Sequence, residues 1–430
     1  MIATLFIVLV VTLLLGIPVG FSIGISTVAA ILVNGSLSVS IVAQKLIDGV
    51  NSFPLMALPL FVLSGAIMMY GSTPKIMNLA HLLLRKKPWG IGNVGIIGCA
   101  AFGTISGSGV ATTSAIGSIV EPEMVKSGYS KGFTAAAIAG AGTLGAVIPP
   151  SIGFVVYAQV ANVSISDMFM AGFLPGILTA FFICLLNKYM VKKNGWGKTD
   201  EKREEYYASL TKKDKRKIVL EAIPPLLMPI FVLGGVLSGI VTATEAAAVA
   251  CIYALILSMF VYKELKPKEL IKVLTKSAVN SSTILIIIAF AAPFAWVMTS
   301  QNVTTAIANM VMGISSSVWI VYGLIIFILL VLGTFMETLA ITLLTTPMFL
   351  PIVTALGMDP VAYGITMSLA LGIGAVTPPL AVCLFTSSKI VNIRIEETVP
   401  DALKVCGVML AACLLTAIFP IISTFLPGIL

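Results

Sequence analysis

The sequence predicts an all-α polytopic membrane protein with two inverted repeats, each holding a re-entrant helical hairpin and an interrupted helix. Of the 430 residues, 58% are apolar and only 10% are charged, whereas a soluble domain carries about 25% charged residues. Apolar stretches of the roughly 20 residues needed to cross a bilayer recur along the chain. Several motifs of the first half return in the second half at a constant offset. These three observations exclude a soluble globule and indicate a duplicated membrane domain.

Charge and residue usage exclude several other classes of protein. The chain has 26 Lys and Arg against 18 Asp and Glu, a net charge of +8. The basic residues occupy short loops between apolar segments, as in loops that face the cytoplasm, so nucleic-acid binding is not predicted. With one histidine, no ATP-binding pattern and no His/Cys/Asp cluster, the sequence predicts neither an enzyme nor a bound cofactor. All six cysteines lie inside apolar stretches without paired spacing and are interpreted as small core residues.

Taken in order, the candidate membrane elements are 2–33, 50–70, 93–125, 132–162, 167–190, 218–240, 241–262, 277–300, 318–355, 360–388 and 397–427. The first lacks a basic leader and a clear cleavage site, so we interpret it as a membrane segment, broken near Gly16-Ile17-Pro18. The only long hydrophilic stretch, 191–217, is predicted to be a cytoplasmic basic linker. It would separate a first repeat, 1–190, from a second, 218–430.

Matched motifs support the duplication. Gly103-Thr104 corresponds to Gly333-Thr334, and Pro122 corresponds to Pro351. Gly145-Ala146-Val147-Ile148-Pro149-Pro150 corresponds to Gly374-Ala375-Val376-Thr377-Pro378-Pro379. The offset stays at 229 or 230 throughout, which chance similarity between Gly- and Pro-rich membrane segments explains poorly.

The placement of basic residues predicts that the repeats are inverted. Segment 93–125 has basic residues at both ends (Arg85, Lys86 and Lys87 before it, Lys126 and Lys131 after it), so it should enter and leave on the cytoplasmic side, with its tip at 106–109. The equivalent segment 318–355 has no Lys or Arg nearby, from Gln301 through Tyr363, and should enter from the outside. If the remaining segments cross the membrane in the directions that these two hairpins require, Lys45 is the only basic residue on the outer side.

Four breaks in the apolar pattern are the candidate functional segments: the two hairpin tips and the interruptions inside 132–162 and 360–388. Unpaired backbone groups cost several kcal/mol in hydrocarbon, so irregular backbone persists only where protein, water or an ion satisfies it. Freed carbonyls with Ser and Thr oxygens suit an alkali cation, and half-helix N-termini suit an anion. The alternative is that the small residues only permit tight helix packing.

Intramembrane acids are costly and often functional, and two stand out here. Glu337 lies at the second hairpin tip and is a candidate for organising an ion site. Glu245 could act in the same way, but its spacing from Thr242 also fits a capping box at the start of a helix. His81 falls on an amphipathic stretch, 73–87, and is predicted to lie on its solvated face.

The motifs together resemble a known family. Ser106-Gly107-Ser108-Gly109-Val110-Ala111-Thr112, then Glu123-Met124, Gly128-Tyr129 and the first Pro-Pro break, resemble the large membrane subunit of tripartite ATP-independent periplasmic (TRAP) transporters. The resemblance covers essentially the whole chain. It implies a secondary transporter of the bacterial inner membrane that imports carboxylates with a sodium gradient, through a scaffold and an elevator-like moving domain. It also implies two partners, a small four-helix membrane subunit and a periplasmic substrate-binding protein. Many relatives carry a basic residue near Ser300-Gln301, and this chain does not.

With this resemblance, the breaks predict specific sites. One sodium ion is expected near Ser106, Ser108 and Gly145, and another near Thr334, Glu337, Gly374 and Thr377. The substrate-binding candidates are Ser106, Ser108, Ser151 and Thr377. Because these segments contain no Lys or Arg, a sialic acid is favoured over a C4-dicarboxylate as substrate. The alternative function is a proton-coupled organic anion transporter or exporter that uses Glu245 and Glu337.

Overall fold

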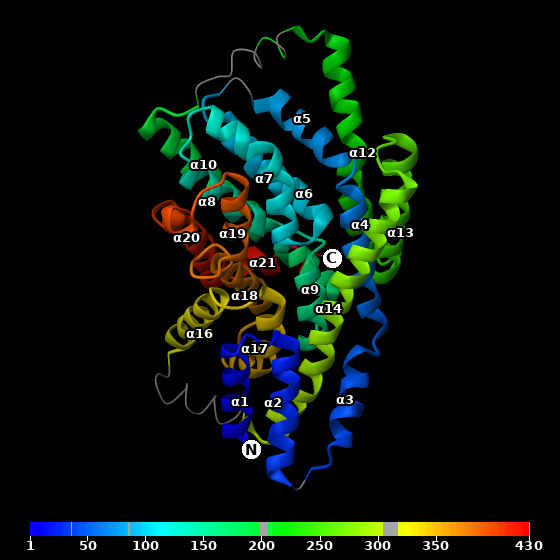
Figure 1. Cartoon of the computed structure of the whole chain (residues 1–430), viewed down its shortest axis with the longest axis vertical. Helices are drawn as coiled ribbons and strands as arrows, with labels where there is room; N and C mark the ends of the chain where they lie inside the picture. The colour runs from blue at the N-terminus through cyan, green and yellow to red at the C-terminus, as the bar shows by residue number, and fades with distance from the viewer. Residues whose placement is uncertain are drawn as a thin grey trace.

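The computed structural model describes residues 1–35, 37–84, 87–197, 205, 207, 209–303 and 317–429. Within these residues the regular elements are helices, with α5, α6 and α7 toward one end of the molecule and α1, α2 and α3 toward the other (Figure 1). In order, the helices are α1 (Ile2–Leu14), α2 (Val19–Asn34), α3 (Ser40–Val50), η1 (Phe53–Met56), α4 (Ala57–Met68), α5 (Ser72–Leu84), α6 (Gly90–Ser106), α7 (Gly109–Lys126), α8 (Lys131–Gly142), η2 (Thr143–Ala146), α9 (Ile152–Ala161), α10 (Ile165–Asn194), α12 (Lys212–Leu237), α13 (Ala243–Leu255), η3 (Ile256–Val261), α14 (Pro267–Ser300), α16 (Val318–Gly333), α17 (Thr338–Ala355), α18 (Pro360–Gly374), α19 (Val382–Ile390), α20 (Ile395–Ile418) and α21 (Ile421–Thr424).

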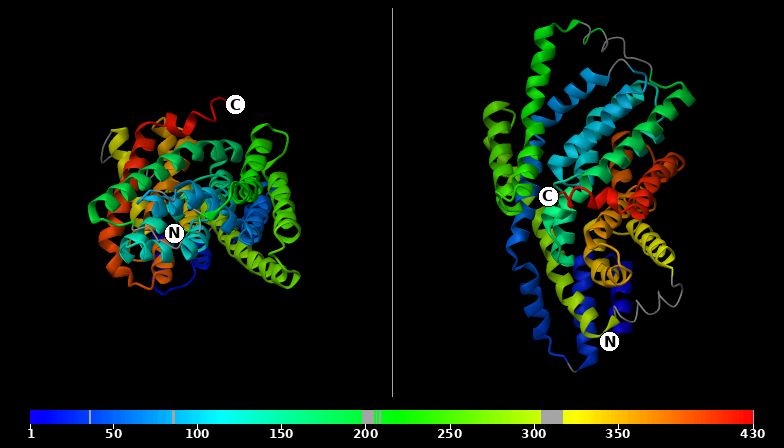
Figure 2. Two further views of the ribbon diagram at one scale, coloured as in Figure 1. Left: turned by 90° about the horizontal axis from the view of Figure 1, so that it is seen from above. Right: turned by 180° about the vertical axis from the view of Figure 1, so that it is seen from behind.

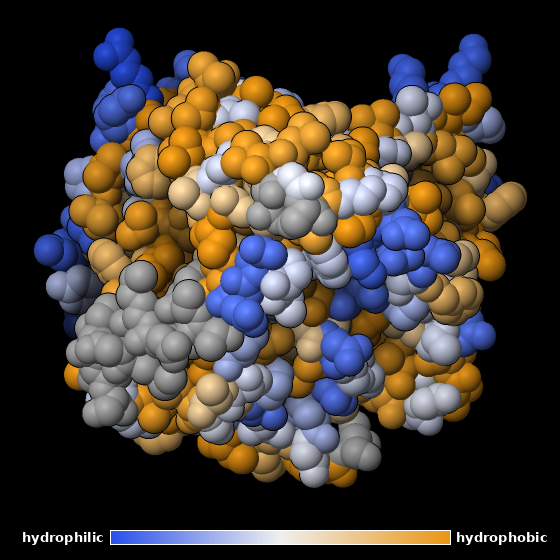
Figure 3. Space-filling view, turned by 90° about the horizontal axis from the view of Figure 1, so that it is seen from below, coloured by the Kyte–Doolittle hydropathy of each residue, from blue (hydrophilic) through white to orange (hydrophobic). Residues whose placement is uncertain are grey.

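Six of these helices are long and apolar enough to cross a membrane, or seven if the bent pair α3 and η1–α4 is one span. Large apolar side chains are exposed along the outside of the bundle, which is the arrangement that a lipid environment favours; they include Leu14, Phe181, Ile230, Phe260, Trp319 and Phe327. Seen from below, the molecule carries hydrophilic residues across its middle, a broad hydrophobic area above them, and further hydrophilic residues that project at the upper corners (Figure 3). The predicted fold class is therefore confirmed at the level of a polytopic helical membrane protein.

The predicted break near Gly16 is confirmed, and two other elements differ from the sequence-based prediction in their bounds. Segment 2–33 forms two helices, α1 and α2, that pack side by side, because the chain turns back at Gly16 with a left-handed φ of +77°. Segment 50–70 starts earlier, at α3, and bends by 63° before α4. Helix α14 begins at Pro267, ten residues before the predicted start at 277. Hydropathy misses these first turns because they are polar. Arg85, Lys86 and the centre of the predicted linker lie outside the described residues.

A group of helices at one side forms a frame for the rest. The segment η1–α4 packs parallel to α13–η3. Every seventh residue of α13–η3 donates to a carbonyl of η1–α4: Thr244 to Phe53, Cys251 to Leu60 and Ser258 to Ile67, at 2.9–3.3 Å. Helices α2 and α3 lie against α14, where Gly24 faces the ring of Phe290 and Gly49 faces Ala292. Small residues thus let these backbones approach closely, as membrane helix interfaces require.

The two hairpins and two interrupted helices pack around a shared apolar core. Helices α6 and α7 form the first hairpin, and α8, η2 and α9 form the first interrupted helix. Helices α16 and α17 form the second hairpin, and α18 with α19 forms the second interrupted helix. Seen from behind, the first hairpin lies toward one end of the molecule and the second toward the other, with α20 and the chain's C-terminal end at mid-height (Figure 2). This arrangement places both hairpin tips near the centre.

The prediction for His81 is wrong. Its side chain is buried on α5, with Nε2 3.2 Å from Oε2 of Glu123 near the end of α7. It also lies beside the ring of Tyr207, at 6.4 Å between ring centres. The amphipathic pattern marked α5 as a surface helix, but the face that carries His81 packs on the hairpin. Only the position of Glu123, 42 residues further along the chain, would have revealed this contact.

Candidate functional site

The first hairpin tip is a two-residue turn lined by hydroxyl oxygens. Helix α6 ends at Ser106, and Gly107 adopts a left-handed φ of +62°, which glycine accepts without strain. Ser108 is extended and precedes the first residue of α7. The Ser106 hydroxyl lies 2.6 Å from the hydroxyl of Thr112 and 3.3 Å from the carbonyl of Ser108. Two hydroxyls and a carbonyl therefore converge inside the tip.

The first interruption packs directly on this tip. The backbone N–H of Ile152, which follows the Pro149-Pro150 break, donates to the carbonyl of Gly107 at 3.3 Å. A Cβ placed on Gly145 would lie 2.8 Å from the Ser108 carbonyl, and one on Gly103 would lie 2.8 Å from the Gly145 Cα. The structure thus brings Ser106, Ser108 and Gly145 together, as predicted. It adds Thr112, which the sequence placed in the tip but gave no reason to prefer over its neighbours.

The second hairpin and interruption repeat this contact. The backbone N–H of Leu380, which follows the Pro378-Pro379 break, donates to the carbonyl of Thr334 at 3.0 Å. A Cβ on Gly374 would lie only 2.5 Å from the Gly333 Cα. Gly333 and Gly374 are the residues that the sequence pairs with Gly103 and Gly145. The same close approach of two glycines therefore joins tip to break in both halves.

The hydroxyls next to the paired glycines also correspond. Thr104 donates to the carbonyl of Ala101 at 2.7 Å, and Thr334 donates to the carbonyl of Val331 at 2.8 Å. Each hydroxyl thus satisfies a carbonyl one turn earlier on its own helix and keeps its lone pairs free to accept or to ligate. The two hairpins therefore carry the same residue with the same hydrogen bond at corresponding positions, which supports a common origin for them.

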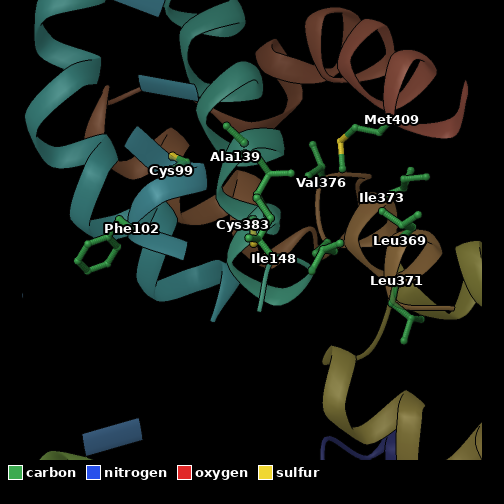
Figure 4. Packing of buried hydrophobic residues seen from close by; sticks show 14 of the residues in the cluster. Cys99, Phe102, Ala139, Ile148, Leu369, Leu371, Ile373, Val376, Cys383 and Met409 are labelled. Atoms are coloured by element: carbon green, nitrogen blue, oxygen red, sulfur yellow. The ribbon is translucent and has the colours of Figure 1, made fainter. Parts of the chain in front are cut away.

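The two halves meet where the first interruption faces the second. Thr143 of η2 lies at this meeting point. A Cβ on Gly109 would lie 3.4 Å from the Cα of Thr143, and a Cβ on Gly372 would lie 3.4 Å from the Cβ of Thr143. A Cβ on Gly109 would also lie 3.4 Å from the sulfur of Cys383 on α19. Buried residues of both halves, among them Ala139 and Ile148 from the first and Val376 and Cys383 from the second, pack together at this junction (Figure 4).

The remaining predicted site residues are less tightly grouped. Ser151 is fully buried, and its hydroxyl donates to the carbonyl of Ala146 at 2.7 Å, within the first interruption. Thr377 donates to the carbonyl of Ile373 at 2.8 Å and lies 3.4 Å from the sulfur of Cys406. Both hydroxyls therefore bond within or beside their own break.

Each of the two predicted acids caps a helix. Glu337 precedes α17, and its carboxylate accepts from the N–H groups of Leu339 and Ala340 at 3.0 and 3.2 Å. Glu245 forms a capping box with Thr242, with bonds of 2.7–3.3 Å, at the exposed start of α13. Of the two interpretations of Glu245, the structure supports the capping box. Glu337 remains at the second tip, with its charge directed at the start of α17.

Taken together, these segments form an oxygen-rich region without a basic side chain. No Lys or Arg occurs between residues 88 and 125, 132 and 187, or 301 and 388. Carbonyls, hydroxyls and helix N-termini are therefore the groups with which both tip-and-break units can bind ions. Neutral oxygens of this kind suit a hard monovalent cation, and the N-termini of α7, α9 and α19 offer partial positive charge to an anion. The N-terminus of α17 is already capped by the Glu337 carboxylate.

Two solved structures have the same architecture. The YdaH transporter of Alcanivorax borkumensis superposes with a TM-score of 0.59 at 13% identity, covering 87% of each chain. MtrF of Neisseria gonorrhoeae superposes with a TM-score of 0.58 at 13% identity, covering 89% of this chain and 83% of its own. This chain therefore shares its fold with these two proteins.

Sequence comparison then gives the family. Residues 6–422 match the family described as "Tripartite ATP-independent periplasmic transporter, DctM component". The C4-dicarboxylate TRAP transporter large permease protein DctM of Rhodobacter capsulatus is 33% identical over 98% of both chains. The sialic acid TRAP transporter large permease protein SiaM of Vibrio cholerae is 32% identical over 96% of this chain and 95% of its own. The isethionate TRAP transporter permease protein DctMQ of Oleidesulfovibrio alaskensis is 39% identical over 97% of this chain, which spans 65% of that relative's length. The chain belongs to the DctM family of large TRAP permeases, and its relatives are transporters and not enzymes.

Proposed function

We propose that this chain is the transport subunit of a sodium-coupled importer of an organic carboxylate in the bacterial inner membrane. The observation that carries the proposal is the repeated contact between hairpin tip and Pro-Pro break: Ile152 N–H to Gly107 carbonyl, and Leu380 N–H to Thr334 carbonyl. Each contact holds an irregular backbone segment, rich in oxygens, against the start of a half-helix. Such paired units bind coupling ions and anionic substrate in transporters built from inverted repeats.

Sodium is proposed at both units. The first site uses Ser106, Ser108 and Gly145, with Thr112 as an added candidate, and the second uses Thr334, Glu337, Gly374 and Thr377. The hairpins and interrupted helices would move together against the frame of α2–α4, α13 and α14, as in an elevator.

Two partners belong to this proposal. A small four-helix membrane subunit would pack on exposed apolar residues of α1, α12 and α13, which include Leu14, Ile230, Phe231, Val249 and Ile252. A periplasmic binding protein would deliver the substrate to the outer end of the moving unit. The proposed transport involves no nucleic acid, and it needs no cofactor other than sodium as the coupling ion.

Reconstitution tests the coupling ion. The chain is incorporated into liposomes with its small subunit and binding protein, and uptake of labelled carboxylate is measured under an inward sodium gradient or an inward proton gradient. We expect uptake with sodium and little with protons alone. Equal uptake driven by protons without sodium would instead support the proton-coupled alternative.

The chemistry of the site also favours a class of substrate. Dianions are usually held by Arg, whose planar fork matches two carboxylate oxygens, and the four tip and break segments have none. Ser106, Ser108, Ser151 and helix N–H groups suit one acidic group accompanied by hydroxyls, with sodium neutralising its charge. A polyhydroxylated monocarboxylate such as a sialic acid is therefore proposed over a C4-dicarboxylate. Isethionate, which the name of one relative contains, is a sulfonate that also carries one negative charge and a hydroxyl group.

Competition during uptake separates these substrates. Excess sialic acid, isethionate or succinate is added to liposomes that take up a labelled sugar acid through the complete complex. Inhibition by sialic acid, and little by succinate, is expected because a second carboxylate would enter the site without a cation to pair with it. Strong inhibition by succinate and none by the sugar acid would reverse the preference.

A further inference from the structure

One buried acid lies outside both proposed ion sites. Glu121 of α7 is fully buried, and one of its carboxyl oxygens, Oε1, is hydrogen-bonded to the hydroxyl of Ser387 on α19. The same hydroxyl lies 2.9 Å from the carbonyl of Ala135 on α8. Gly117, one turn earlier on α7, leaves room for the carboxyl, since a Cβ there would lie 2.7 Å from Oε1. Glu121 therefore sits where a helix of the first hairpin meets a half-helix from the other half of the chain.

The proton count at this junction indicates which form of the carboxyl is present. Ser387 has one hydroxyl proton, yet two acceptors lie within its reach, Glu121 and the Ala135 carbonyl. If Glu121 is the neutral acid, its own O–H donates to Ser387, and Ser387 donates to Ala135, so both contacts are hydrogen bonds. If Glu121 is ionised, one of them is a contact between two acceptors. The neutral acid is the form that satisfies the geometry.

Nearby charges do not compensate an ionised Glu121. Among the described residues, none of the ion pairs within 4.0 Å involves it. The titratable groups on the helices packed against it are Cys99 of α6, Glu123 and Lys126 of α7 itself, Lys131 of α8, and Cys383 and Lys389 of α19, while η2 carries none. Glu123 faces His81, Lys131 reaches the carbonyl of Asn392, and Lys389 lies over the ring of Phe385. A buried carboxylate without a cation is strongly disfavoured, whereas a neutral acid with Oε2 unbonded costs far less.

The internal duplication shows that the fold does not require this pair. With Pro122 matched to Pro351, Glu121 corresponds to Leu350; with the two Pro-Pro breaks matched, Ser387 corresponds to Ala158. Helices α17 and α9, which carry Leu350 and Ala158, also pack together. The equivalent junction, between α17 and α9, therefore has two apolar residues at these positions, and of the two junctions only that of α7 with α19 carries the polar pair.

We propose that Glu121 and Ser387 form a proton-binding site that fastens α19 to α7 and α8 while the proton is bound. Helix α19 is the half-helix that follows the second Pro-Pro break, and Ser387 lies less than two turns from its start at Val382. Loss of the proton leaves a buried charge at the junction, so α19 must shift to admit water or a cation. Its movement would displace the break that contains Thr377.

Infrared difference spectroscopy tests proton binding without any substrate. Spectra of the wild-type chain with its small subunit in liposomes are compared with those of Glu121→Gln, a variant that keeps the side-chain shape and a hydrogen-bond donor but cannot titrate. The comparison is made at about pH 7, which is well above the ordinary glutamate pKa of about 4.3. We expect the difference to show the C=O stretch of a protonated carboxylic acid, and Ser387→Ala to shift that band. Glu123→Gln is the matched control and should leave it in place. A carboxylate band in the Glu121→Gln difference at that pH overturns the proposal.

A second measurement tests the link to the second break, and this part rests on the proposed sodium site. Sodium binding is measured by the change in intrinsic fluorescence as the pH is raised until the acid band disappears. Wild type should lose sodium affinity by about tenfold or more over this range, while Glu121→Gln and the double variant Glu121→Leu/Ser387→Ala should show no such loss. Parallel loss in all three would refute the link and leave the proton site to the infrared result. If no form binds sodium, the proposed coupling ion is wrong, and the infrared outcome still decides the proton site.

Discussion

Gly374→Ala is expected to reduce uptake at least tenfold. A Cβ on Gly374 would lie 2.5 Å from the Cα of Gly333, so the ends of α16 and α18 must move apart. The atom in the way is backbone and cannot rotate aside, and overpacking of this kind costs about 1–3 kcal/mol of folding free energy. The larger effect should fall on transport, because a displacement of about 1 Å at an arranged site can cost about a hundredfold. Uptake in liposomes and the thermal unfolding of the purified complex measure the two effects.

The helix that Gly374 faces supplies a matched control. Gly323 lies in α16, the helix that ends at Gly333, and a Cβ there would meet nothing within 4 Å. Gly323→Ala should therefore keep full uptake and gain slightly in stability from its better helix propensity. Gly103→Ala should resemble Gly374→Ala, since its Cβ would lie 2.8 Å from the Cα of Gly145 in the equivalent contact. If Gly374→Ala transports as well as Gly323→Ala, the close approach of tip and break is not needed for function.

The broken segments could be located from sequence because their signals are local. Gly and Pro interrupt apolar runs at defined positions, and the matched Gly-Ala-Val-x-Pro-Pro motifs fixed both interruptions. The second hairpin, predicted at 318–355, is formed by α16 and α17 over the same residues. The first tip, predicted at 106–109, is the turn between α6 and α7. Each feature depends on the conformations that glycine and proline allow within a few residues.

Features that depend on distant partners could not be predicted in this way. The burial of His81 follows from Glu123, and the hydrogen bonds of Glu121 follow from Ser387, 266 residues away. Hydropathy also underestimates the length of helices with polar starts, so the sequence predicts a segment only from residue 277, whereas α14 begins at Pro267. The sequence predicts a break near Gly16 but not the folding back of α1 on α2, because it does not give the direction in which the chain leaves Gly16. The convergence of Ser106 with Thr112 likewise required the geometry of the tip.

Removing single hydroxyls at the proposed sodium sites should have the second large effect, on the sodium requirement of uptake. Ser106→Ala removes the oxygen that lies 2.6 Å from Thr112 and 3.3 Å from the Ser108 carbonyl. Thr377→Val keeps the branched shape and removes only the oxygen that bonds the Ile373 carbonyl. A polar interaction with a charged group contributes about 1.5–3 kcal/mol. Each variant should therefore need a sodium concentration at least about tenfold higher for half-maximal uptake. The bulkier Ser106→Leu and Thr377→Leu should abolish sodium-dependent uptake at unchanged expression.

Thr354→Val is the matched control for Thr377→Val. The Thr354 hydroxyl also bonds carbonyls one turn earlier, those of Leu350 and Pro351 at 3.0 Å, but it is exposed near the far end of α17. A change in helix stability alone would therefore appear in both valine variants, whereas loss of a sodium ligand would appear only at Thr377. Because the two sites belong to different halves, the double variant Ser106→Ala/Thr377→Val should also lower the steepness of the sodium dependence if two ions bind cooperatively. Unchanged sodium dependence in Ser106→Ala and Thr377→Val, with uptake intact in the leucine variants, would place the coupling ions elsewhere in the chain.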